Sequence, residues 1–152
     1  ANDAFDLSIL ITNNTVFDST DVVMQEYANI ELMLFQNQKK QALAAMDSML
    51  VKYNYHSIVD EVLYLQAQTE LELGHIEKAL LSLDKIKEAH YFEILGDDAL
   101  FLMGTIYQDS LGDNETAMGL FNDLLTKFPG SIYVAEARTR FRELRGDFNN
   151  EN

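Results

Sequence analysis

Three regularly spaced alanines constrain the fold of this 152-residue chain more than any other sequence feature. Ala42, Ala79 and Ala117 stand 37 and 38 residues apart. The residues five positions before them are types that often end helices: Asn37, Gly74 and Gly112. A period of this length is typical of an array in which every unit is one supersecondary motif. The spacing therefore predicts three copies of one small unit.

Each alanine begins an apolar stripe with the spacing of one helix face. After Ala117 the stripe continues at offsets 4, 7, 8 and 11 with Phe121, Leu124, Leu125 and Phe128. The stripe after Ala42 repeats all four offsets with Met46, Met49, Leu50 and Tyr53, and the stripe after Ala79 repeats two of them with Leu83 and Ile86. Further apolar segments precede the turns, at 21–35, 58–73 and 97–111. Each unit is thus predicted to be an αα-hairpin.

A small residue at the three alanine positions suits the closest approach of two helices, since a larger side chain would push them apart. One hairpin cannot bury its own apolar face, so the units must stack. With 47% apolar residues, seven glycines and one proline, the composition favours helices. We predict an all-α fold, a right-handed solenoid of about three αα-hairpins with a flanking helix at each end.

The predicted organisation is a single domain over residues 1–152. Its parts are an N-terminal helix and linker at 1–19, repeats at 20–56, 57–95 and 96–130, a C-terminal capping helix at 131–146, and a disordered tail at 147–152. The N-terminal helix spans 2–12 and is apolar at Phe5, Ile9 and Leu10. This helix is half a unit, so it is either the remnant of an upstream repeat or a divergent cap.

The formal net charge is −14. Such a charge repels nucleic-acid phosphates and anionic membranes, and it favours either basic partners or simple solubility. No apolar run is long enough to span a membrane. The only arginines are Arg138, Arg140, Arg142 and Arg145. They form either a solvated face, with Glu136 pairing to Arg140 four residues on, or a binding face.

No pattern in the sequence indicates catalysis. Cysteine is absent, which excludes thiolate zinc sites and cysteine nucleophiles. His56, His75 and His90 have no metal-binding spacing. Adjacent acids such as Asp97 and Asp98 point about 100° apart on a helix, so they do not converge on a substrate. The sequence predicts no catalytic residues, no metal site and no cofactor.

Residues 100–129 resemble a tetratricopeptide repeat. The resemblance rests on Leu100, Met103, Gly104, Tyr107, Ala117, Phe121, Leu124 and Pro129, with one extra residue placed in the turn before Gly112. The unit at 60–93 keeps Leu63, Ala67, Gly74, Ala79, Leu83 and Ile86. The unit length and the segment FPGSIYVAEARTRFRELRGD are similar to envelope-associated bacterial members, such as the Tol–Pal cell-division coordinator and the outer-membrane assembly lipoprotein.

The resemblance implies a non-catalytic scaffold that binds a peptide or helix of a partner protein on the concave face lined by the first helices. It also implies a bacterial cell envelope or periplasm location. The alternative is structural: the chain is the closing end of a longer repeat protein, or part of a homo-oligomer, with no ligand of its own.

Eight residues form the candidate concave face. Tyr27, Tyr64 and Phe101 stand 37 residues apart and form an aromatic ladder. One helical turn after each aromatic residue lie Glu31, Gln68 and Thr105. One turn before Tyr64 and Phe101 lie Glu61 and Asp98. Aromatic anchors with polar neighbours suit a peptide groove, and the acids favour a basic segment. Alternatively the aromatics are core between repeats, and the acids complement helix dipoles.

Overall fold

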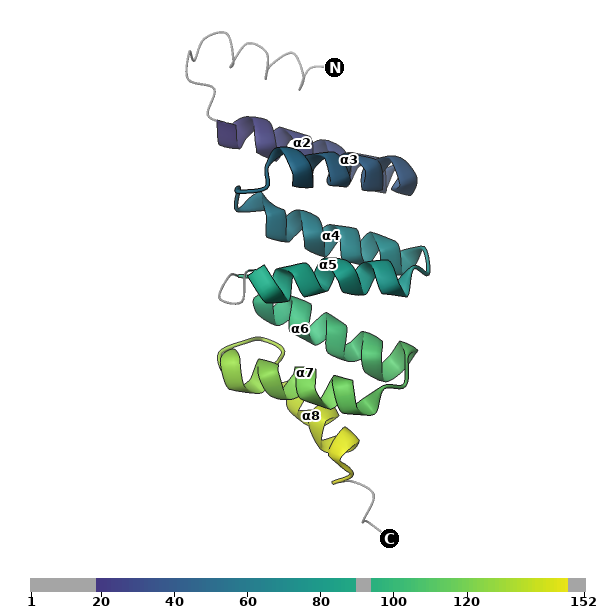
Figure 1. Cartoon of the computed structure of the whole chain (residues 1–152), viewed down its shortest axis with the longest axis vertical. Coiled ribbons are helices and arrows are strands. Elements are labelled where there is room, and N and C mark those ends of the chain that lie inside the picture. The colour runs from purple at the N-terminus through teal and green to yellow at the C-terminus, as the bar shows by residue number, and fades with distance from the viewer. Residues whose placement is uncertain (1–18, 90–93, 148–152) are drawn as a thin grey trace. The chain divides into compact units, whose positions relative to one another are not determined.

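The computed structural model describes residues 19–89 and 94–147. These residues form helices and connecting turns and contain no strand. The helices, in chain order, are α2 (Ser19–Phe35), α3 (Lys39–Lys52), α4 (Ile58–Glu72), α5 (Ile76–Ala89), α6 (Gly96–Thr105), α7 (Asn114–Lys127) and α8 (Val134–Arg145) (Figure 1). The predicted N-terminal helix at 2–12 and nearly all of the predicted tail lie outside the described residues.

The chain divides into two compact units, Ala1–Ile58 and Val59–Asn152. In the first unit, α2 and α3 pack together as a hairpin. Its buried core is Val23, Ile30, Ala42, Met46 and Met49. Glu26 on α2 accepts hydrogen bonds from Lys52 Nζ at 2.8 Å and from the Tyr53 hydroxyl at 2.9 Å. These bonds tie the middle of α2 to the end of α3.

In the second unit the helices stack in the order of the chain: α5 contacts α6, α6 contacts α7, and α7 contacts α8 (Figure 1). Sequential stacking of αα-hairpins is the arrangement of a helical solenoid. Fully buried apolar side chains line the stack: Val62, Ala67, Ala79, Leu83, Ile86, Ala99, Leu100, Ala117, Phe121, Leu124 and Ala137. The all-α solenoid class predicted from the sequence is confirmed.

The three residues predicted to end the first helices have left-handed backbone conformations. The φ angles are 60° at Asn37, 80° at Gly74 and 64° at Gly112. This conformation costs glycine little and asparagine less than most residues, which explains the residue types. After Asn37 the backbone N–H of Gln38 donates to the Met33 carbonyl, five residues back. Such bonds satisfy carbonyls that the helix end would leave unpaired.

The third hairpin differs at this point from what the sequence predicts. The extra residue does not lie in the turn, because α6 widens into a π-helix, η1 (Ile106–Ser110). The Leu111 N–H donates to the Ile106 carbonyl at 3.1 Å, and the Asp113 N–H donates to the Tyr107 carbonyl at 2.9 Å. The bond that closes this helix end, from Asp113 to Tyr107, therefore spans six residues, whereas the equivalent bond after Asn37 spans five. A single π-helical turn absorbs one extra residue without breaking the helix.

Gly104 lies at a close contact between α6 and α7. A Cβ atom built on Gly104 would lie 2.6 Å from Cε1 and 2.7 Å from Cζ of Phe121. Phe121 is fully buried, so its ring has no free space into which it could move. The glycine thus makes room for a large aromatic side chain on the facing helix. Ala42, Ala79 and Ala117 are also fully buried, as expected for positions at helix–helix contacts.

Candidate functional site

The candidate residues on α4 share one helix face. Glu61, Tyr64 and Gln68 are spaced by three and four residues, and side chains at this spacing are neighbours on a helix. Glu61 and Tyr64 are half-buried, whereas Gln68 is exposed. The face therefore presents a carboxylate, a phenol and an amide to its surroundings.

The candidate residues on α6 follow the same spacing, and two of them contact the segment that leads into α8. The Tyr133 hydroxyl donates a hydrogen bond of 2.6 Å to Asp98 Oδ1. The Tyr133 ring stacks on Phe101 with centroids 4.5 Å apart and an interplanar angle of 12°. The Thr105 hydroxyl donates to the Leu102 carbonyl of its own helix at 2.8 Å. Asp98 and Phe101 are thus held in place by Tyr133.

Charges on α6 influence the candidate face of α4. Burial raises the pKa of the Tyr64 hydroxyl, and the negative charges of Asp98 and Asp97 raise it further. Burial also raises the pKa of the Asp98 carboxyl, while the hydrogen bond from Tyr133 opposes this change. The pKa of the Tyr133 hydroxyl is raised chiefly because this hydroxyl donates its hydrogen bond to Asp98. The result is a cluster of phenols and carboxyls over α4 and α6.

The two candidate residues in the first unit lie on α2. Tyr27 and Glu31 are four residues apart and so lie on one face of that helix. Tyr27 is half-buried and Glu31 is exposed. The continuation of the aromatic ladder from Tyr27 to the second unit stays a prediction of the sequence.

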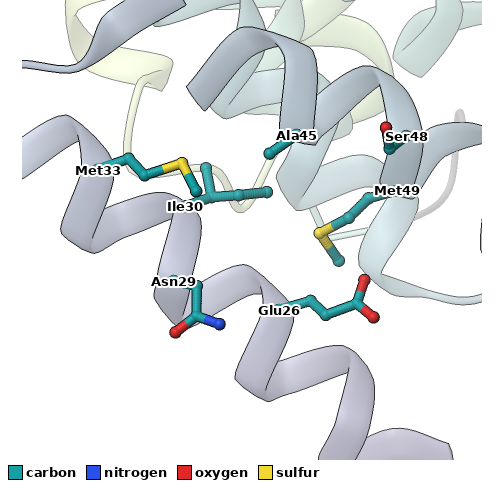
Figure 2. A pocket seen from close by; sticks show the side chains of 7 residues that line it. All are labelled: Glu26, Asn29, Ile30, Met33, Ala45, Ser48 and Met49. Atoms are coloured by element: carbon teal, nitrogen blue, oxygen red, sulfur yellow. The ribbon is translucent and has the colours of Figure 1, made fainter. Parts of the chain in front are cut away.

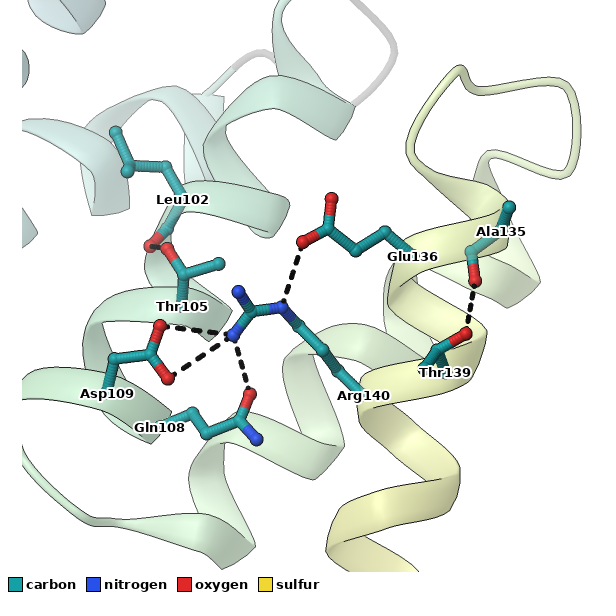
Figure 3. Close-up of polar contacts among 8 residues, drawn as sticks. All are labelled: Leu102, Thr105, Gln108, Asp109, Ala135, Glu136, Thr139 and Arg140. Carbon is teal, nitrogen blue, oxygen red and sulfur yellow. Dashed lines mark hydrogen bonds and ion pairs between the residues drawn. The ribbon is translucent and has the colours of Figure 1, made fainter.

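Arg140 anchors α8 on the π-helical turn (Figure 3). Its Nη1 donates to Gln108 Oε1 at 2.9 Å and to Asp109 Oδ2 at 3.1 Å. Its Nε donates to Glu136 at 3.3 Å, the pair expected four residues apart on one helix. The guanidinium also lies 6.0 Å from the centroid of the Phe101 ring. Arg138 and Arg142, by contrast, are exposed.

Two features of this region escape sequence reasoning. Tyr133 reads as an ordinary residue at the start of a helix, yet it covers Phe101 and binds Asp98. The partners of Arg140 on the π-helical turn lie more than 30 residues away in the sequence. The one available signal was the extra residue before Gly112, which marks a local departure from the repeat. Such departures often coincide with functional or structural adaptation.

An open groove runs between α2 and α3 in the first unit (Figure 2). Its lining residues are Glu26, Asn29, Ile30 and Met33 of α2 and Ala45, Ser48 and Met49 of α3. The groove joins an apolar interior to a polar rim. Within residues 19–89 and 94–147, no group of three His, Cys, Asp or Glu side chains could hold a metal ion. None of the helices described is long and apolar enough to cross a membrane.

Comparison with known proteins identifies the repeat. The family model described as tetratricopeptide repeat matches residues 98–131, which span α6, η1 and α7. A crystal structure of a tetratricopeptide repeat protein from Parabacteroides merdae is similar, with a TM-score of 0.68 and 18% sequence identity. The similarity covers 94% of this chain and 52% of that protein, so the chain spans about half of its length. No curated protein matches the sequence.

These comparisons support a relationship to the tetratricopeptide repeat family, and the fold is that of its helical solenoids. Repeats of this family typically mediate protein–protein interaction and are generally non-catalytic. The envelope-associated type predicted from the C-terminal segment stays a prediction of the sequence.

Proposed function

We propose that this protein is a non-catalytic interaction scaffold, and that the surface formed by α4 and α6 binds a basic peptide or helical segment of a partner protein. The proposed surface consists of Glu61, Tyr64, Gln68, Asp98, Phe101 and Thr105. The observation that carries the proposal is the Phe101 ring next to the Asp98 carboxyl on α6, where Tyr133 contacts both, together with the negative charge of Asp98 and Asp97 that raises the pKa of Tyr64 on α4. An aromatic ring next to negative charge suits a lysine or arginine side chain.

Several features support this choice of partner. The chain has a net charge of −14, which speeds the encounter with a basic segment. Gln68 is exposed at the same helix face and can bond the backbone of an extended peptide. The similarity of the C-terminal segment to envelope-associated members extends the proposal to a partner in the bacterial cell envelope.

The experiment compares matched charge changes on two helices. Glu61→Lys places a positive charge on the proposed surface, and Glu88→Lys makes the same change on the exposed side of α5. Partners are captured from an extract of the source cell at two salt concentrations. The captured segment is then titrated against each variant. We expect Glu61→Lys to raise the Kd at least tenfold and Glu88→Lys to leave it within twofold.

A second pair of variants tests the aromatic contribution. Tyr64→Ala removes the proposed anchor, and Leu81→Ala removes an exposed apolar side chain of α5 that is not part of the surface. Phe101 is a poor choice for this test, because its ring also supports Tyr133 and Phe121. Equal affinities for all four variants would exclude the surface. Capture of nothing but the protein itself would favour the structural alternative, a homo-oligomer or the end of a longer array.

A further inference from the structure

One face of α2 in the first unit is both apolar and exposed. Met24, Ala28, Leu32 and Phe35 follow one another at intervals of three or four residues, so they share one face of the helix, the α2 stripe. Met24, Leu32 and Phe35 are 48%, 52% and 89% exposed, and Ala28 is exposed too. A surface helix normally has one apolar face, and α2 already packs such a face against α3. The second apolar face of α2 therefore needs a partner of its own.

The later hairpins are polar where the α2 stripe is most exposed. The residues 37 and 74 positions after Met24 are Glu61 and Asp98, and those after Phe35 are Glu72 and Asp109. Apolar side chains at these two positions are therefore not a requirement of the repeat. An exposed apolar face that the fold does not need indicates an interaction surface.

The middle of the α2 stripe indicates that its partner is a helix. Leu32 is exposed, but the equivalent residues of the second and third hairpins, Thr69 and Ile106, are buried. In the third hairpin α6 packs against α5, a helix of the preceding hairpin. Stacked repeats cover this side of a first helix with a helix of a neighbouring unit. The occupant expected on the α2 stripe is therefore a helix with an apolar face.

The charge of the first unit favours a second copy of the chain as the source of that helix. Residues 19–58 hold four acidic residues and three lysines, whereas the whole chain has a net charge of −14. Two copies therefore repel each other over most of their surface, and they repel each other least where their first units meet. A basic partner segment, in contrast, gains little from a nearly neutral apolar face.

We propose that the protein forms a symmetric dimer in which the α2 stripes of two copies pack antiparallel. Met24 of each copy then contacts Phe35 of the other, and Ala28 faces Leu32 of the other. Both contacts fit one antiparallel register, because Met24 precedes Ala28 by four residues and Phe35 follows Leu32 by three. A twofold axis repeats each contact, as an interface between identical surfaces requires.

The proposed contacts pair side chains that suit each other. The small side chain of Ala28 leaves room for Leu32 of the second copy, so the two helices can approach closely. The thioether of Met24 makes favourable contact with an aromatic ring such as that of Phe35. A single pair of helices buries less than the roughly 800 Å² per partner of a typical stable interface, so we expect a dissociation constant in the micromolar range.

Sedimentation equilibrium of the purified protein tests the dimer without any other partner. Met24→Glu/Phe35→Glu gives the α2 stripe the acids of the later hairpins and should raise the dissociation constant at least tenfold. The matched control Val51→Glu/Tyr55→Glu adds the same charges at residues that are 81% and 97% exposed in the same unit, and it should leave the constant within twofold. Equal weakening by the two double variants would overturn the proposal. A wild type that stays monomeric up to about 1 mM would also overturn it, and would assign the stripe to a helix of another protein.

Disulfide formation between copies tests the register, because the chain has no cysteine of its own. An equimolar mixture of Ala28→Cys and Leu32→Cys brings the two thiols together across the proposed interface. The control mixture replaces Leu32→Cys with Ala44→Cys, at an exposed position of α3. Under mild oxidation we expect the mixed disulfide to form at least tenfold faster in the first mixture. Equal rates would contradict the proposed register.

The dimer lies in the first unit alone, so it goes beyond the proposed partner-binding surface of α4 and α6. Its failure and the failure of that surface are separate results. Self-association is measured with the purified protein and changes at α2, whereas partner binding is measured with the captured segment and changes at α4.

Discussion

The second and third hairpins solve the same packing problem with different residues. At equivalent positions the second hairpin has Ala67 and Leu83, whereas the third has Gly104 and Phe121, and all four are buried. The smaller residue on α6 is matched by the larger one on α7, since the ring of Phe121 occupies the place where a Cβ of Gly104 would lie. The difference shows that the repeat conserves the volume of the contact and lets the residue types change.

A neighbouring pair of positions differs in polarity. In the second hairpin the Ser82 hydroxyl donates a buried hydrogen bond of 2.8 Å to Gln66 Oε1. In the third hairpin the equivalent residues are Met103 and Leu120, which are buried and apolar. Both solutions are physically sound, because a buried polar pair is tolerated when its members bond to each other.

The largest effect is expected from a single carbon atom at the contact of α6 and α7. Gly104→Ala should lower the free energy of unfolding by about 1–3 kcal/mol, because the new methyl group overlaps the buried Phe121 ring. Urea denaturation at constant pH measures the change. Gly119→Ala is the control: nothing lies within 4 Å of its Cβ position on α7, and it should stabilise by about 0.5–1 kcal/mol.

A double variant sharpens the comparison. Gly104→Ala/Phe121→Leu gives the third hairpin the residue pair of the second. If volume is what the repeat conserves, the double variant should be more stable than Gly104→Ala alone. Additive losses from the two changes would show that the hairpins are not interchangeable at this contact.

The sequence predicts the helix ends, the helix contacts and one ion pair well, because each of these features depends on one local requirement. A left-handed turn needs glycine or asparagine, so Asn37, Gly74 and Gly112 are recognisable as helix ends. Close helix approach needs a small residue, so the period of alanines reveals the fold. The ion pair of Glu136 and Arg140 follows from their spacing on one helix.

Other features depend on three-dimensional placement and leave no such signal. An extra residue before Gly112 is compatible with a longer turn or with the π-helix that forms, because both keep the same sequence spacing. The stacking of Tyr133 on Phe101 joins the segment that leads into α8 to α6, and the bond from Arg140 to Asp109 joins α8 to the π-helical turn. For the candidate site, helix spacing predicts which side chains share a face, but the contact of Tyr133 with that face emerges only from packing.

The second prediction concerns the polar pair of the second hairpin. Ser82→Ala removes the donor to Gln66 and should cost about 1 kcal/mol. Gln66→Met/Ser82→Ala imitates the apolar character of the third hairpin, and it should recover part of that loss because no buried amide then lacks this bond. Thermal and urea unfolding compare the two. If Gln66→Met/Ser82→Ala is less stable than Ser82→Ala, the amide of Gln66 itself stabilises the hairpin.

The third prediction tests how α8 is attached to the third hairpin, which alone has the π-helical turn among the three. Arg140→Gln removes ion pairs to Asp109 and Glu136, and it should cost about 0.5–1 kcal/mol because both carboxylates are largely exposed. The loss should shrink in 1 M salt, where the Debye length is about 3 Å. Arg138→Gln, at an exposed position, should change stability little. Equal losses for the two arginines would exclude the anchor.

The smallest effect concerns pH and the contact between Asp98 and Tyr133. Burial raises the pKa of Asp98 in the folded state, so the folded protein holds this proton more tightly than the unfolded chain. Asp98 therefore contributes its full stabilisation at pH values below its unfolded-state pKa, which is about 4. This contribution is lost as the pH rises from that value through the raised pKa of the folded state. Asp98→Asn keeps an oxygen that can accept the Tyr133 bond and removes the ionisation. We therefore expect it to be slightly more stable than the wild type at pH 7 and equal to it below about pH 3.5.

Tyr133→Phe should act in the opposite direction at the same site. The hydrogen bond from Tyr133 favours the ionised carboxylate, so its removal should raise the pKa of Asp98 further. The variant should then lose stability more steeply than the wild type as pH rises, and Asp98→Asn in the same background should abolish that slope. Urea midpoints measured between pH 3 and pH 8 report all three proteins. Parallel pH profiles for wild type and Tyr133→Phe would mean that the ring stacking on Phe101, and not the hydroxyl, is what Tyr133 contributes to the third hairpin.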